Sequence, residues 1–194
     1  MSSGVALIVV AFLLGTIPFG YVLTRAAGLG DIRRVGSGST GATNVLRTGR
    51  KDIALVTLLL DAGKGALAVW LARRAGYGWD AAAAVAAVLG HCHSIWMRGQ
   101  GGKGVATGLG VMLVLSWPVA LFTALVWLAV AVATRISSAG ALAATAVSPL
   151  AMFVWAGPVP ALAVFLIALE IIWRHRANIV RLRAGTEPRI GRKA

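Results

Sequence analysis

The chain has 194 residues, of which 58% are hydrophobic and only 13% are charged, and its mean hydropathy is +0.82. A soluble domain is about half apolar and about a quarter charged, so this composition excludes a soluble globular protein. The nineteen basic and six acidic residues give a net charge of +13, but the basic residues lie between apolar runs. That placement is typical of topology determinants and anion ligands, and we expect no nucleic-acid partner. The single cysteine, Cys92, excludes a disulfide framework.

Apolar runs of membrane-spanning length predict an all-α integral membrane protein with one membrane domain. The run over 105–134 is divided at Pro118, because proline lacks an N–H donor and disfavours helix in the residue before it. Gly157-Pro158 marks the turn between the last two runs. We therefore predict seven transmembrane helices, whose short re-entrant or cytoplasmic loops form the active site. Their approximate bounds are 5–24, 53–72, 81–97, 105–116, 118–134, 138–156 and 159–173, followed by a basic tail at 174–194.

Basic residues concentrate in segment 25–51 and in the tail, and the positive-inside rule places both in the cytoplasm. Seven spans satisfy this rule, with the N-terminus outside and the C-terminus inside. Six spans would export either the segment or the tail.

The first polar region is VGSGSTGATNVLRTGR at 35–50. Its glycines match G-x-G-x-x-G, but no strand precedes them, so we do not expect a dinucleotide fold. Closely spaced glycines let backbone N–H groups converge on an anion, and Arg47 can hold a phosphate through two parallel hydrogen bonds. Hydroxyl donors are added by Ser37, Ser39, Thr40 and Thr43. The alternative is a flexible, solvated loop whose arginines set the topology.

The second polar region is Gly101-Gly102-Lys103-Gly104, which differs from a Walker A loop by lacking the first glycine and the Ser or Thr after the lysine. A lysine among glycines at the start of a helix is a ready anion site. The alternative is an ordinary turn with a snorkelling lysine. Asp61 and Lys64 are three residues apart on one helix face inside a span, so they form either a buried structural pair or part of the substrate site.

Histidines and the tail complete the set of candidates. His91 and His93 are two residues apart in a helix and point to different sides, so we expect neither a shared metal nor any other metal site or cofactor. His175, Asn178 and Arg181 share one face of a tail helix. An amphipathic basic helix on the anionic inner leaflet is the alternative, and it leaves Asn178 unexplained.

Four motifs in this order resemble bacterial acyl-phosphate:glycerol-3-phosphate acyltransferases, the PlsY family. They are GSGSTGATNVLRTG at 36–49, DAGKG at 61–65, GH at 90–91 followed by GGKGVAT at 101–107, and HRANIVRLRAGTEPRIG at 175–191. The resemblance implies transfer of a fatty acyl group from acyl phosphate to the 1-hydroxyl of sn-glycerol 3-phosphate. The implied reaction gives lysophosphatidic acid and inorganic phosphate at the cytoplasmic face of a bacterial inner membrane, with membrane lipid around the enzyme. Functional coupling to an enzyme that forms acyl phosphate is also expected.

The resemblance implies catalytic roles for Ser37, Lys103, Asn178 and His175. Ser37 and Asn178 would hydrogen-bond the glycerol phosphate or the oxyanion, while His175 would order that face or move the proton. A phosphate oxygen of the donor is the alternative proton acceptor. The residues predicted to bind substrate phosphate are Gly36, Gly38, Ser39, Thr43, Asn44, Arg47, Lys64, Gly101, Gly102 and Gly104.

Two functions from other classes are weighed against the transferase. A small organic-phosphate transporter or channel would explain Asp61 and Lys64 within a span, but no inverted repeat is present in the sequence. A structural subunit that recruits partners through its basic tail would leave the GGKG motif and Asn178 unexplained.

Overall fold

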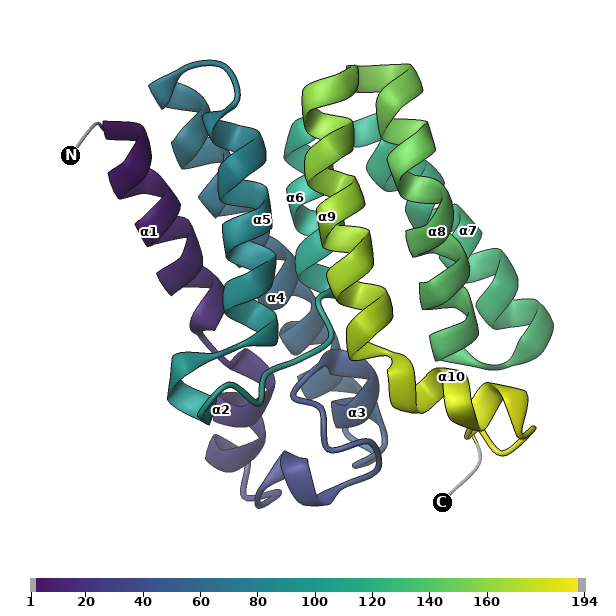
Figure 1. Ribbon diagram of the computed structural model, residues 1–194. Helices are drawn as coiled ribbons and strands as arrows, with labels where there is room; N and C mark the ends of the chain where they lie inside the picture. Colours follow the sequence, from purple (N-terminus) through teal and green to yellow (C-terminus); the bar gives the residue numbers. More distant parts are fainter. Residues whose placement is uncertain (1–2, 192–194) are drawn as a thin grey trace.

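The computed structural model describes residues 3–191, which form helices and no strands. Long helices run side by side, and the short helices α2, α3 and α10 gather at the lower end of the bundle in Figure 1. The long helices are α1 (Ser3–Thr16), α4 (Lys51–Ala72), α5 (Trp79–Cys92), α6 (Val105–Leu115), α7 (Trp117–Thr134), α8 (Ser137–Ala156) and α9 (Pro158–Arg174). The short elements are α2 (Phe19–Ala26), α3 (Ala42–Leu46), α10 (Arg176–Arg183) and the 3-10 turns η1 (Ile32–Arg34), η2 (Arg73–Ala75) and η3 (Ile95–Met97).

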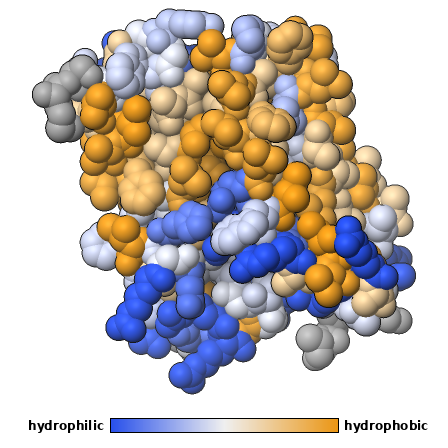
Figure 2. Space-filling view, in the orientation of Figure 1, coloured by the Kyte–Doolittle hydropathy of each residue, from blue (hydrophilic) through white to orange (hydrophobic). Residues whose placement is uncertain are grey.

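The surface of the bundle is divided along its length. Figure 2 shows hydrophobic residues over the upper and middle part of this face and hydrophilic residues at the lower end. Four helical segments are long and apolar enough to cross a membrane, and α9 with α10, bent by 59°, would make a fifth. Those four are Ser3–Ala26, Lys51–Ala75, Trp117–Thr134 and Ser137–Ala156. The predicted all-α membrane architecture is confirmed, whereas the count of seven crossings stays a prediction because α5 and α6 have only 14 and 11 residues.

The first predicted span, 5–24, is divided into two helices. α1 ends at Thr16 and α2 begins at Phe19, because Pro18 has no N–H and disfavours helix at Ile17. The break leaves the carbonyl oxygen of Ile17 without a helical donor, and Lys64 Nζ donates to it over 2.7 Å.

Two further boundaries depend on single residues. The predicted helix over 81–97 ends at Cys92, since His93 leaves the helical conformation with φ −116° and ψ 49°. The residues that follow form the separate turn η3. The predicted division at Pro118 agrees with the structure, where an extended Ser116 (φ −160°) separates α6 from α7.

Glycine and alanine let the helices approach backbone to backbone. α1 packs on α5, and α4 packs on α6. A Cβ atom on Gly15 would overlap the carbonyl oxygen of Ala87, and one on Gly110 would overlap that of Ala62. Small residues are typical of helix contacts in membranes, where close van der Waals packing replaces the hydrophobic effect. The spacing between α4 and α6 therefore depends on Gly110. This spacing also positions the start of α6 and Lys103 just before it.

We predict that Gly110→Ala lowers the thermal stability of the detergent-solubilised protein by about 1–3 kcal/mol, because the added methyl group forces α6 away from α4. Gly63→Ala is the matched control. Its Cβ would meet nothing within 4 Å, and alanine is favoured over glycine in a helix by about 1 kcal/mol. Thermal unfolding of both variants checks this; equal melting temperatures would contradict it.

Candidate functional site

Lys103 and Asn178, 75 positions apart in sequence, form the centre of a polar cluster at the lower end of the bundle in Figure 1. Lys103 Nζ donates to Asn178 Oδ1 over 2.6 Å, and Asn178 Nδ2 donates to Glu187 Oε1 over 2.5 Å. Ser138 Oγ donates to the same Glu187 oxygen over 2.7 Å. Arg181 Nε donates to Glu187 Oε2 over 2.7 Å. The buried carboxylate of Glu187 thus connects α8, α10 and the segment after α10.

Neither Glu187 nor Ser138 was predicted from the sequence as a site residue. Burial by itself raises the pKa of Glu187, but hydrogen bonds from Asn178, Ser138 and Arg181 outweigh it and hold the pKa below its usual value. The carboxyl group is therefore ionised at neutral pH. Its place in the last motif, GTEPRIG, is the one sequence signal that could have identified it.

The glycines before Lys103 fix its loop against α5 and α9. The N–H of Gly101 donates to the carbonyl of Cys92 and that of Gly102 to the carbonyl of His91, both over 3.1 Å. The Arg174 guanidinium donates to the carbonyls of Gly101 and Gly102 over 3.3 and 3.2 Å. A Cβ on Gly102 would overlap the His91 ring. In this structure the N–H groups of these two glycines are engaged within the fold, and their contribution to phosphate binding stays a prediction.

The pKa of Lys103 depends on its burial and on neighbouring charges. Burial lowers the pKa of Lys103 to about 8. Glu187 acts in the opposite direction, and the guanidinium groups of Arg181, Arg47 and Arg174 add to the lowering. The ammonium group is therefore charged at neutral pH, and Arg47 of the first polar loop lies near enough to act on it. Gly104, with φ +88°, ends the loop as the N-cap of α6.

Asn44 organises the loop that precedes Arg47. Its side chain is buried, and its Oδ1 accepts hydrogen bonds from the N–H of Ser37 over 3.1 Å and from Arg47 Nη1 over 3.4 Å. Its Nδ2 lies within 3.1 Å of three carbonyl oxygens, those of Ile32, Val35 and Ser39. Because every polar atom of the side chain is engaged, Asn44 is a loop organiser in this structure, and its role as a phosphate ligand stays a prediction.

The first glycines of this loop make room for side chains. Gly36 has φ +52°, and a Cβ there would lie 2.6 Å from Arg47 Nη1 and 2.7 Å from Asn44 Oδ1. Gly38 has φ +69°, and its N–H donates to the carbonyl of Val35 over 3.0 Å. The N–H group of Gly38 thus closes a turn, and its role in anion binding stays a prediction. Ser37 stays adjacent to Arg47 with its hydroxyl group outside these contacts.

The other two predicted phosphate ligands of the loop are placed differently. Ser39 Oγ accepts a hydrogen bond from the N–H of Gly41 over 3.3 Å. Thr43 Oγ1 is exposed and lies 3.3 Å from Ser137 Oγ at the start of α8. This contact joins α3 to the helix that carries Ser138, so the first loop and the Lys103 cluster share one end of the bundle.

His175 lies at the bend between α9 and α10. Its ring is buried, and Nδ1 is 2.7 Å from the carbonyl oxygen of Ile171. A carbonyl oxygen only accepts, so this partner assigns the proton to Nδ1 and leaves Nε2 of the neutral ring as an acceptor.

Lys64 is enclosed in the bundle beside Asp61, at the level of the break in α1–α2. Its Nζ lies 2.7 Å from Asp61 Oδ1, in poor hydrogen-bond alignment, so the attraction is chiefly electrostatic. His91 Nδ1 lies 3.5 Å from the same oxygen. The side chains of Lys64, Asp61 and His91 are only 3, 2 and 5% exposed. Lys64 therefore belongs to a buried pair with Asp61, and its role in phosphate binding stays a prediction.

The second histidine of the 91–93 pair has a separate partner. His93 Nε2 is 2.8 Å from Glu170 Oε1 on α9, whereas His91 faces Asp61. Within residues 3–191, no three His, Cys, Asp or Glu side chains are grouped so that they could hold a metal ion.

Comparison with known proteins matches the glycerol-3-phosphate acyltransferase family model to residues 5–185. The chain belongs to this family. A glycerol-3-phosphate acyltransferase from Cereibacter sphaeroides is 57% identical over 95% of this chain and 92% of its own length. One from Roseobacter denitrificans is 52% identical over 95% of this chain and 93% of its length.

A solved structure shows the same architecture. It is the crystal structure of PlsY, an integral membrane glycerol 3-phosphate acyltransferase, in its glycerol 3-phosphate form. The TM-score is 0.93 at 38% identity, with 97% of this chain and 96% of that chain covered. The resemblance stated from the four motifs is confirmed at the level of the family.

The buried pair in this family member leads to a stability prediction. Lys64→Met leaves Asp61 charged and unpaired in the core, and we expect it to destabilise the protein by about 3–5 kcal/mol. The double variant Asp61→Asn/Lys64→Met removes both charges and should recover most of that loss. Thermal unfolding in detergent measures both. A double variant no more stable than Lys64→Met would show that the pair is not the reason for the loss.

Proposed function

We propose that the chain transfers a fatty acyl group from acyl phosphate to the 1-hydroxyl of sn-glycerol 3-phosphate. The observation that carries the proposal is the convergence of Lys103, held by Asn178, with Arg47 and its neighbour Ser37 at one end of an apolar bundle. Two phosphates and an alkyl chain need cations and hydroxyl donors beside lipid, and this end of the bundle offers both. Membership of the family and the similarity to PlsY support it.

The chemistry asks little covalent work of the protein. The hydroxyl oxygen of glycerol 3-phosphate attacks the acyl carbonyl carbon, a new ester C–O bond forms, and the C–O bond to the phosphate of the donor breaks. Phosphate is a ready leaving group, so the enzyme has to position both substrates and stabilise the negative charge that develops. Lys103 keeps two of its three N–H donors free of Asn178, and Arg47 presents its guanidinium plane to a phosphate.

The remaining roles follow the available atoms. Ser37 and Asn178 would hydrogen-bond the glycerol phosphate or the oxyanion. Nε2 of His175 is an acceptor that could order the attacking hydroxyl group or take its proton. A phosphate oxygen of the donor is the alternative acceptor, and in that route the proton leaves with the inorganic phosphate.

We infer seven membrane crossings, with the N-terminus outside and the lower end of the bundle in the cytoplasm of a bacterial inner membrane. The arginine-rich segment 25–51 and the tail up to Gly191 lie at that end together, which is what the positive-inside rule requires. In that position the site would receive acyl phosphate from the enzyme that forms it and release lysophosphatidic acid to phospholipid biosynthesis.

A transporter of organic phosphate finds less support. Asp61 and Lys64, the residues that suggested it, face each other in the closed core, and Lys64 also donates to the carbonyl of Ile17.

Alanine variants of the two cations test the phosphate-binding site. Arg47→Ala and Lys103→Ala should each lower turnover by roughly 10²-fold or more, because each removes a group that stabilises developing charge. Purified protein in detergent is given palmitoyl phosphate and glycerol 3-phosphate, and released phosphate is measured. Arg34→Ala and Lys51→Ala, which remove charge from exposed positions of the same segment, are the controls. Wild-type rates from both Arg47→Ala and Lys103→Ala would refute the site. The assay also separates a transferase from a transporter, because transport can be measured only across the membrane of a sealed vesicle.

The pKa of Lys103 predicts a pH dependence. The charged ammonium is lost as the pH rises through about 8, so kcat/KM for acyl phosphate should fall above that pH. The arginine of Lys103→Arg keeps its charge to above about pH 12. The fall in kcat/KM should therefore move to higher pH in this variant, even if its absolute rate is lower. The pH dependence is measured from initial rates between pH 6 and 10, a range set by this pKa of about 8. The rates are corrected for spontaneous hydrolysis of the acyl phosphate. An unchanged decline in Lys103→Arg would assign the titration to another group.

A further inference from the structure

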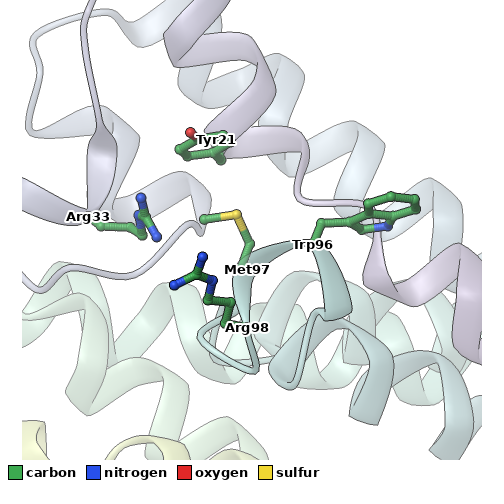
Figure 3. A pocket seen from close by; sticks show the side chains of 5 residues that line it. All are labelled: Tyr21, Arg33, Trp96, Met97 and Arg98. Atoms are coloured by element: carbon green, nitrogen blue, oxygen red, sulfur yellow. The ribbon is translucent and has the colours of Figure 1, made fainter.

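A second cationic site lies between α2, η1 and η3 and includes no residue of the Lys103 cluster. It is a cavity of about 370 Å³ lined by Tyr21, Arg33, Trp96, Met97 and Arg98. Figure 3 shows the guanidinium groups of Arg33 and Arg98 on the same side of Met97, turned toward one another, with the ring of Tyr21 opposite them.

The charges in this cavity are unbalanced. Arg33 binds Asp31 through Nε and Nη2, over 2.9 and 2.6 Å, which leaves its Nη1 free of that carboxylate. Within residues 3–191, the Arg98 side chain has no hydrogen-bonded or ion-paired partner. Arg25 and Arg33 also lie 6.0 and 5.4 Å from the ring centre of Tyr21. Of the two arginines that line the cavity, only Arg33 is paired with a carboxylate, and an anion between Arg33 and Arg98 would offset their repulsion.

The backbone directs Arg98 into this place at some cost. Arg98 has φ +53°, the left-handed region that residues other than glycine rarely adopt, and it ends the turn η3. Among residues 3–191, Arg135 is the only other such residue that is not glycine. A strained residue that carries an unpaired charge into a cavity is typical of a binding site.

Exposed aromatic and apolar side chains lie at the rim of the cavity. Trp96 is 68% exposed while its Nε1 donates to Oγ1 of Thr16, the last residue of α1, over 3.1 Å. Ile95 beside it is 50% exposed. Exposed tryptophan and tyrosine are typical of the headgroup level of a bilayer. Figure 2 shows the change from hydrophobic to hydrophilic surface in the lower part of the molecule, where Figure 1 places α2 and η3.

We propose that this cavity binds the phosphate headgroup of an anionic phospholipid from the surrounding leaflet. Arg33 and Arg98 would hold the phosphate, while the exposed Trp96 and Ile95 would lie against the glycerol backbone and the first carbons of the chains. A soluble phosphate would meet only the arginines, so the lipid is the ligand that uses both halves of the site. The proposal does not depend on acyl transfer.

The binding of intact lipid to the full-length protein tests this. Detergent-solubilised protein is titrated with dioleoyl phosphatidylglycerol, and the lipid retained is counted by native mass spectrometry. Arg98→Asn should weaken the tightest binding by about tenfold, which corresponds to the loss of one charge-assisted hydrogen bond. Asparagine tolerates the left-handed conformation, so the turn should be kept. Arg33→Gln is the second variant, in case Arg98→Asn does not fold.

Arg135→Asn is the matched control, since it removes the same charge from the same backbone conformation away from the cavity. It should bind phosphatidylglycerol like the wild type. Dioleoyl phosphatidylcholine should bind at least about tenfold more weakly than phosphatidylglycerol, for lack of net charge. Equal phosphatidylglycerol binding by Arg98→Asn and the wild type would overturn the site. Displacement of the lipid by an equal concentration of inorganic phosphate would overturn the choice of a lipid.

Discussion

The carboxylate of Glu187 is the constraint on which the arrangement of the site depends. An amide has a donor end and an acceptor end, and the bond from Asn178 Nδ2 to Glu187 fixes which end faces Lys103. Asn178 Oδ1 therefore accepts a hydrogen bond from the Lys103 ammonium, and the remaining N–H donors of that lysine point away from Asn178. The orientation is set before any substrate arrives, because Ser138 and Arg181 hold the carboxylate from α8 and α10. Such preorganisation is what stabilises developing charge without reorganisation.

The charge balance of the whole chain has the same logic. Each of the six acidic residues has a basic partner. The pairs are Asp31–Arg33, Asp52–Arg50, Asp61–Lys64, Asp80–Arg73, Glu170–His93 and Glu187–Arg181. Among residues 3–191, Arg47 and Arg98 are two of the basic residues that are left without carboxylate partners, and Lys103 binds a neutral amide. Part of the net charge of +13 thus lies at Arg47, Lys103 and Arg98, where the two proposals place substrate phosphates and a lipid headgroup.

The order and type of the helices follow from hydropathy and proline, which act locally, so the division at Pro118 could be predicted. Lys103 and Asn178 could also be predicted as site residues, because packing alone rarely requires a basic or amide side chain at the end of an apolar run. The contacts of the glycine N–H groups could not be predicted. Gly102 in a sequence is compatible with a phosphate-binding N–H group and with close packing, and only the fold shows that its N–H donates to the carbonyl of His91. Glu187 lies in the last motif, but its contacts could not be predicted, since Asn178 and Arg181 come from α10 and Ser138 from the distant helix α8.

Lys64 shows why buried polar residues are ambiguous in a sequence. A charge inside a span implies either a ligand or an internal partner, and Asp61 three residues earlier is compatible with both. The structure adds His91, which lies against Asp61 on one side and against Gly102 on the other. The buried pair therefore supports, through one imidazole ring, the loop that presents Lys103. Arg174 holds the same loop from α9, so the position of the cation is determined by two helices at once. A lysine fixed in this way can remain close to Arg47 and Arg181, whereas a lysine on a mobile loop would move away from its like-charged neighbours.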